Sequence, residues 1–80
     1  MGNYDIDISF IEQNKDRIIR GIPVNVHIRD NENFSWKWVK ALISSSPEQG
    51  GETIEVAHST TSFDRTGEKW YIRILEEIAD

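Results

Sequence analysis

The spacing of hydrophobic and polar residues first predicts a helix. Ser9, followed three residues later by Glu12, has the form of a capping box, in which the two side chains satisfy free backbone amides at the start of a helix. Gly21 is a typical C-terminal stop. A short strand over the alternating residues 4–10 is the alternative interpretation of the first part of this segment. The apolar positions that fit the helical period are Phe10, Ile11, Ile18 and Ile19.

From Val24 onward the period changes to two. Val24, Val26 and Ile28 alternate with polar residues, as in a strand with one buried face. Residues 30–33 read DNEN, a turn, and residues 34–44 form an aromatic and apolar run, so the two segments predict a β-hairpin. A helix over residues 34–44 is the alternative, but two tryptophans, a valine and an isoleucine favour a strand.

The second half of the chain predicts further strands separated by polar connections. Residues 44–51 are rich in serine, proline and glycine and form a loop. Residues 53–57 and 69–75 have the composition of strands, with a polar connection over 59–67 between them. The last residues, 76–80, are expected to form a short turn or a fifth strand.

This order of elements places the chain in the α+β class, as a single domain over residues 1–80. We expect an N-terminal helix and then four or five strands in a strongly bent antiparallel sheet or a small barrel, a layout that resembles SH3-like and Sm-like barrels. Residues 24–30, the aromatic run and a last strand ending in LEEI at 75–78 resemble WYL domains and the Rof-type inhibitors of the transcription terminator Rho. The second resemblance implies a partner in the transcription machinery. WYL domains carry Trp-Tyr-Leu on an inner strand, whereas WYI at 70–72 falls on the last predicted strand, so no ligand-binding residues are transferred.

Composition and charge narrow the function. A chain without cysteine has no disulfides, no thiolate zinc site and no thiol nucleophile, which favours a reducing compartment. The first residues lack the basic and apolar pattern of a secretory signal, so we expect a cytoplasmic protein without membrane contact. The net charge of −5 argues against general phosphate binding. Counting acids and bases gives −3 over residues 1–14, +3 over 15–40 and −5 over 41–80, so acidic ends frame a basic middle.

Groups suited to catalysis are sparse. Neither His27 nor His58 belongs to an HExxH arrangement. Asp5 and Asp7 share a face if the chain is extended there, but a charged strand edge explains them better than a catalytic carboxylate pair. The glycine pair at 50–51 is not followed by the Lys-Ser or Lys-Thr of a phosphate loop. We therefore expect no enzymatic activity, no metal and no cofactor.

The aromatic strand FSWKWVKAL has no clean inner face, because both sets of alternate positions contain apolar and basic residues. A β-bulge near Trp38 and Val39 would explain this pattern. We expect Trp36 to pack in the core against Ile28 and Ile72, and Trp38 to lie at the surface. The competing interpretation is that a chain this small needs all its tryptophans for the core.

An exposed tryptophan beside basic side chains predicts a binding surface, since tryptophan and arginine are enriched at interface hot spots. We expect the protein to occupy a surface of a larger protein, as an inhibitor, immunity factor or regulatory adaptor. The alternative is a small barrel that binds single-stranded nucleic acid, with tryptophans stacking on bases and basic side chains meeting phosphates. The chain itself is expected to be a monomer or a homodimer paired through a free strand edge. The candidate partner-binding residues are Trp38, Lys37, Lys40, Trp36, Arg29 and Arg73.

Overall fold

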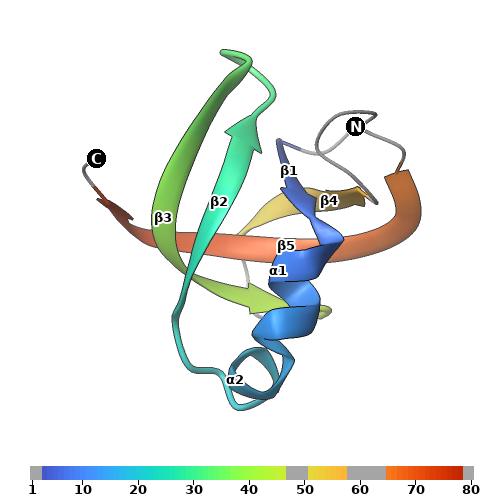
Figure 1. Cartoon of the computed structure of the whole chain (residues 1–80), viewed down its shortest axis with the longest axis vertical. Helices are drawn as coiled ribbons and strands as arrows, with labels where there is room; N and C mark the ends of the chain where they lie inside the picture. Colours follow the sequence, from blue (N-terminus) through green and yellow to red (C-terminus); the bar gives the residue numbers. More distant parts are fainter. Residues whose placement is uncertain (1–2, 47–50, 58–64, 79–80) are drawn as a thin grey trace.

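The computed structural model describes residues 3–46, 51–57 and 65–78 and shows a closed five-stranded barrel with two short helices between its first two strands (Figure 1). Around the barrel the strand order is β1-β2-β3-β5-β4. Neighbouring strands are antiparallel except β1 and β4, which are parallel. The elements are β1 (Tyr4–Asp7), α1 (Ile8–Gln13), α2 (Lys15–Ile19), β2 (Val24–Asp30), β3 (Ser35–Ser44), β4 (Glu52–Ala57) and β5 (Arg65–Ile78).

The predicted α+β class is wrong, because strands dominate the described chain and the helices span only six and five residues. The expected continuous helix is interrupted at Asn14, whose backbone leaves the helical region. Its side-chain amide donates to the Phe10 carbonyl at 2.9 Å and satisfies the last turn of α1. The alternative strand before the helix exists as β1, and Gly21 follows α2 with a φ of +73°. The closed barrel is compatible with the small SH3-like or Sm-like barrels that the layout resembles.

The N-terminus of α1 is capped by Asp7 and not by Ser9. The Asp7 carboxylate accepts a hydrogen bond from the Ser9 amide at 2.9 Å, and the Asp7 backbone is extended, as is usual for a capping residue.

The substitution Asp7→Ala is therefore expected to lower the free energy of unfolding by about 1 kcal/mol, because the amide loses its acceptor. Ser9→Ala keeps that acceptor and should cost less than about 0.5 kcal/mol. Urea unfolding of the two variants measures the difference. A larger loss for Ser9→Ala would show that the cap is assigned to the wrong residue.

Small aliphatic side chains fill the barrel. In β3 the inward face carries Val39, Ala41 and Ile43, all buried. The face with Trp36 and Trp38 lies outside, so the predicted packing of Trp36 against the core is wrong. The tryptophans lie outside because a barrel with so few strands has a narrow interior, which valine, alanine and isoleucine side chains already fill. The core consists of Ile6, Ile11, Ile18, Val24, Val26, Ile28, Val39, Ala41, Ile43, Ile54, Val56 and Ile72.

The predicted bulge exists, but at another position and in another strand. The register shifts between Lys40 and Ala41 of β3, which pair with Glu76 and Ile74 of β5, so the extra residue is Leu75. β3 therefore keeps a regular alternation, and β5 bends. Figure 1 shows β5 as a long curved strand. Its first half pairs with β4 and its second half with β3, which closes the barrel. The closing residues up to position 78 belong to β5 and form no separate element.

The predicted β-hairpin is confirmed, and its turn is well ordered by side-chain hydrogen bonds. β2 and β3 are antiparallel, with Asp30 opposite Ser35. The Asp30 carboxylate accepts from the backbone amides of Glu32 and Asn33, and these hydrogen bonds lower the pKa of Asp30.

Three sequence predictions lie outside the described residues: His58, the centre of the loop at 47–50 and the polar connection up to residue 64.

Candidate functional site

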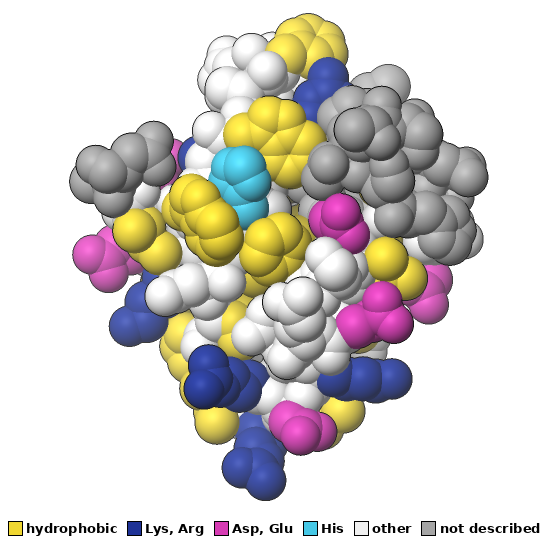
Figure 2. All heavy atoms as spheres, in the orientation of Figure 1, with side chains coloured by type: hydrophobic (Ala, Val, Ile, Leu, Met, Phe, Trp, Pro, Cys, Tyr) yellow, Lys and Arg dark blue, Asp and Glu magenta, His cyan; other side chains and the backbone are white. Residues whose placement is uncertain are grey.

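Aromatic rings lie side by side on the outer surface of the β2–β3 hairpin (Figure 2). The His27 ring is stacked on Trp38, with centroids 5.0 Å apart and 21° between the planes. Its centroid is also 5.1 Å from that of Trp36. Phe10 of α1 meets Trp38 edge to face at 5.7 Å. We call Phe10, His27, Trp36 and Trp38 the aromatic stripe. Figure 2 shows the cyan histidine ring surrounded by yellow aromatic side chains.

The hairpin register builds this stripe. His27 is directly opposite Trp38 in the hairpin, and Arg29 is opposite Trp36. Residues opposite each other point to the same side of a sheet, so His27, Arg29 and both tryptophans point outward together. Each aromatic contact of this kind is worth about 0.5–1.5 kcal/mol beyond the area it buries. The rings therefore hold each other in place, and a surface that is already ordered loses little side-chain entropy when it binds.

The stripe continues toward the hairpin turn through Arg29 and Phe34. The Arg29 guanidinium carbon lies 5.1 Å from the centre of the Phe34 ring, a cation–π contact. Phe34 is 72% exposed, and its φ of +55° lies in the left-handed region that phenylalanine seldom adopts. An exposed, conformationally strained aromatic residue at the end of a rigid hairpin is typical of a contact position.

Because of this strain, Phe34→Gly is expected to keep or raise the free energy of unfolding, by up to about 1 kcal/mol, since glycine adopts positive φ at no steric cost. Phe34→Ala is the matched variant, because it removes the ring but keeps the strain. It should be about 1 kcal/mol less stable than the glycine variant. Equal thermal stabilities of the two variants would contradict the left-handed conformation.

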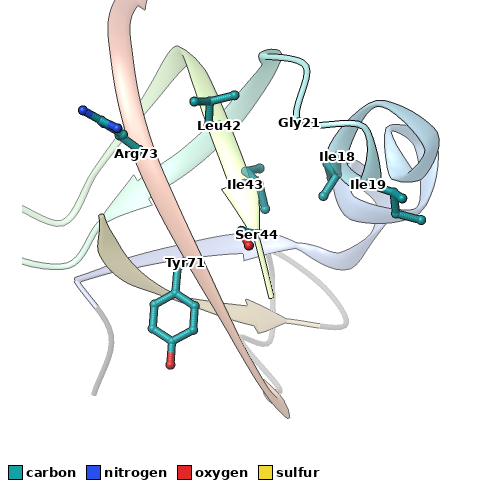
Figure 3. A pocket seen from close by; sticks show the side chains of 8 residues that line it. All are labelled: Ile18, Ile19, Gly21, Leu42, Ile43, Ser44, Tyr71 and Arg73. Atoms are coloured by element: carbon teal, nitrogen blue, oxygen red, sulfur yellow. The ribbon is translucent and has the colours of Figure 1, made fainter. Parts of the chain in front are cut away.

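The six predicted binding residues do not form one surface. Trp36, Trp38 and Arg29 lie together, and Trp38 is 39% exposed as expected for a surface residue. Lys40 shares their orientation, farther along β3. Arg73 lies on β5 and lines a separate hollow, across from the α2 side chains that also line it (Figure 3).

Lys37 is separated from the stripe because it leaves the opposite face of β3. Its Nζ donates to Glu77 Oε1 at 2.9 Å and lies 5.4 Å from the centre of the Tyr4 ring. Burial and a hydrogen bond to Glu52 raise the pKa of Tyr4 to about 12. These side chains close one end of the barrel, so Lys37 has a structural role there.

The raised pKa of Tyr4 predicts a loss of stability at alkaline pH. The folded state holds the phenolic proton up to about pH 12 and the unfolded state only up to 10.0. The contribution to stability is therefore complete below pH 10.0 and is lost as the pH rises toward 12. In urea unfolding over this interval, Tyr4→Phe should lose less free energy of unfolding than the natural chain. Parallel losses in the two proteins would contradict the prediction.

Two residues of the stripe were not among the predicted binding residues. Phe10 fits the apolar face of the predicted helix, and His27 is a polar position of the predicted strand. The position of His27 could have been predicted from the hairpin register, because a pairing that places Asp30 opposite Ser35 also places His27 opposite Trp38. Phe10 has no such signal, since its contact depends on how α1 packs.

A buried carboxylate lies beside the stripe. Asp5 of β1 is 1% exposed, and its Oδ2 is 3.8 Å from a guanidinium nitrogen of Arg29, the residue opposite it in β2. A buried charge requires a partner of opposite sign. Arg29 is therefore held by Asp5 on one strand and covered by the Phe34 ring, and it stiffens the stripe.

Comparisons with protein families, with curated proteins and with solved structures find no match for this chain. Among the described residues, no group of three histidine or acidic side chains is placed to hold a metal ion. Neither described helix is long and apolar enough to cross a membrane. The geometry of the aromatic stripe is thus the main guide to function.

Proposed function

We propose that the protein is a non-enzymatic binding module that occupies a surface of a larger protein through the aromatic stripe, as an inhibitor, immunity factor or regulatory adaptor. The observation that supports this most is an ordered stack of rings on the outside of the barrel, where it is not needed to fill the core. Apolar residues border it, since Phe34 is 72% and Ile78, opposite Trp38, is 37% exposed. Exposed aromatic clusters of this kind are typical of protein interfaces.

The orientation of the rings favours a protein over single-stranded nucleic acid. Proteins that bind single strands offer ring faces on which bases stack. Here the His27 ring stacks on Trp38, and the Phe10 ring packs against Trp38 at 85°, so ring faces are used within the stripe. The basic side chain next to these rings is engaged as well, because Arg29 lies beside Asp5.

Shape and charge suggest the kind of protein that binds. A ridge of ordered aromatic side chains fits an apolar groove. The chain has a net charge of −5, so long-range attraction favours a basic partner and speeds its association. We therefore infer a partner with an apolar groove bordered by lysine or arginine. The Rof-like layout makes a component of the transcription machinery the first partner to examine.

The proposal is tested by capture from host lysate on the immobilised protein, with and without nuclease and at low and high salt. A protein retained after nuclease treatment supports it. Capture that disappears with nuclease and weakens steeply with salt would instead assign the stripe to single-stranded nucleic acid.

A further inference from the structure

Two adjoining hollows lie beside α2. Their volumes are about 160 and 250 Å³, and Ile18, Ile19 and Ser44 belong to the walls of both. Figure 3 shows the smaller hollow, with lining residues from α2, β3 and β5 around it. None of the four residues of the aromatic stripe lines either hollow. We call the two hollows together the α2 groove.

The walls of the α2 groove are mostly apolar. Ile19 lines both hollows and is 73% exposed, so a partner that covers it removes aliphatic surface from water. An apolar cavity of about 150 Å³ holds a benzene-sized group, so each hollow has room for one apolar side chain of a partner. Trp70 lines the larger hollow and Tyr71 the smaller one. Two residues of the WYI run, which the aromatic stripe does not contain, therefore contribute to this groove.

One basic residue lines each hollow. Lys15 of α2 lines the larger hollow, and Arg73 of β5 lines the smaller one. Among the described residues no acidic residue lines either hollow, and neither Lys15 nor Arg73 forms an ion pair. The position of Arg73 outside the aromatic stripe thus has a role of its own. Apolar walls with two cations are complementary to apolar side chains that are accompanied by carboxylates.

We propose that the α2 groove binds a peptide segment of a partner protein, in which two apolar side chains are accompanied by aspartate or glutamate. One apolar side chain enters each hollow, and the carboxylates pair with Lys15 and Arg73. The net charge of −5 repels a strongly acidic partner at long range, so a carboxylate for each cation fits better than an acidic run. Because the groove and the aromatic stripe share no residue, the inference does not rest on the proposed function.

Random peptides displayed on phage are the probe for this proposal. Phage that bind immobilised Ile19→Ser are removed first, and the remainder are selected on the natural chain. Ile19 is exposed, so this variant should keep the fold and the aromatic stripe while it loses a wall of both hollows. The selected peptides should combine two apolar residues with aspartate or glutamate. A selection that enriches no peptide, or only peptides without acidic residues, would overturn the proposal.

The affinity of one selected peptide, measured by fluorescence polarisation, then locates the contact. Arg73→Glu and Lys15→Glu should each weaken binding at least about tenfold, because a carboxylate then faces the carboxylates of the peptide. Arg17→Glu is the matched control, since it makes the same charge change on α2 but Arg17 lines neither hollow. It should weaken binding less than about threefold, because salt screens a charge that makes no contact. Equal losses for Arg17→Glu and Arg73→Glu would contradict a contact in the groove.

An exchange of charges gives the sharpest result. The same peptide with lysine in place of its acidic residues should bind Arg73→Glu more tightly than it binds the natural chain. Trp38→Ala should bind the original peptide as the natural chain does, and a loss there would move the contact to the aromatic stripe. Vesicles that contain phosphatidylserine are the last probe, since a bilayer also offers apolar and anionic groups. Vesicle binding that Ile19→Ser abolishes would assign the groove to a membrane surface and overturn the proposal.

Discussion

Replacing Gly51 with alanine is expected to lower the free energy of unfolding by about 3 kcal/mol or more. Gly51 has a φ of +100°, which strains any residue with a side chain. A Cβ atom there would also overlap the backbone carbonyl of Ile72, at the point where β5 turns from β4 toward β3. Backbone cannot yield as a flexible side chain would, so β4 and β5 must separate locally. In a domain of 80 residues this is a large share of the total stability.

Gly67→Ala provides the control. Gly67 also has a positive φ, of +83°, but among the described residues no atom lies within 4 Å of the position that its Cβ would take. It should lose only the conformational term, about 1 kcal/mol. Urea unfolding of the two variants separates the strain of a positive φ from the overlap of the new Cβ with the Ile72 carbonyl. Equal losses in the free energy of unfolding would show that Gly51 does not approach Ile72 closely.

The second large effect is expected for Ile28→Ala, with a loss of about 3–4 kcal/mol in the free energy of unfolding. Ile28 is fully buried in the barrel, so its removal leaves a cavity. Trp38 is a larger residue, but it lies outside the barrel and is 39% exposed. Trp38→Ala removes its two ring contacts, with Phe10 and His27, which are worth about 1–3 kcal/mol together, and it leaves no cavity in the core.

This comparison tests which side of the hairpin is the inside. Denaturant unfolding of both variants, monitored by circular dichroism, gives the two free energies. A Trp38→Ala variant as unstable as Ile28→Ala would place Trp38 in the core, and the aromatic stripe could not then be a binding surface.

The hairpin and most strands could be predicted because their evidence is local. The inward positions of β2 alternate with polar residues, and the DNEN turn fixes the register. The inner face of β3 could not be assigned in this way, because tryptophans on one face compete with Val39, Ala41 and Ile43 on the other. Only closure into a narrow barrel decides that the aliphatic face is buried. The full length of β5 was missed for a related reason, since its exposed end at Glu76 and Glu77 has the composition of a turn.

The candidate site was predicted in part. Trp38 was placed at the surface and Arg29 beside it, because both depend only on alternation along neighbouring strands. Lys37 was included because it is next to Trp38 in sequence, yet adjacent residues of a strand point to opposite faces. Phe10 joins the stripe through the packing of α1, which no local pattern specifies.

The central claim is that the aromatic stripe binds a protein, and the most direct test is quantitative capture of a nuclease-resistant partner by three forms of the chain. These are the natural protein, Trp38→Ala, and Lys69→Ala as an exposed control outside the stripe. We expect Trp38→Ala to stay folded and to lose at least about tenfold in affinity, since truncating an interface hot spot costs about 2 kcal/mol or more. Lys69→Ala should bind as the natural protein does. Equal capture by a folded Trp38→Ala variant would show that the partner does not bind at the aromatic stripe.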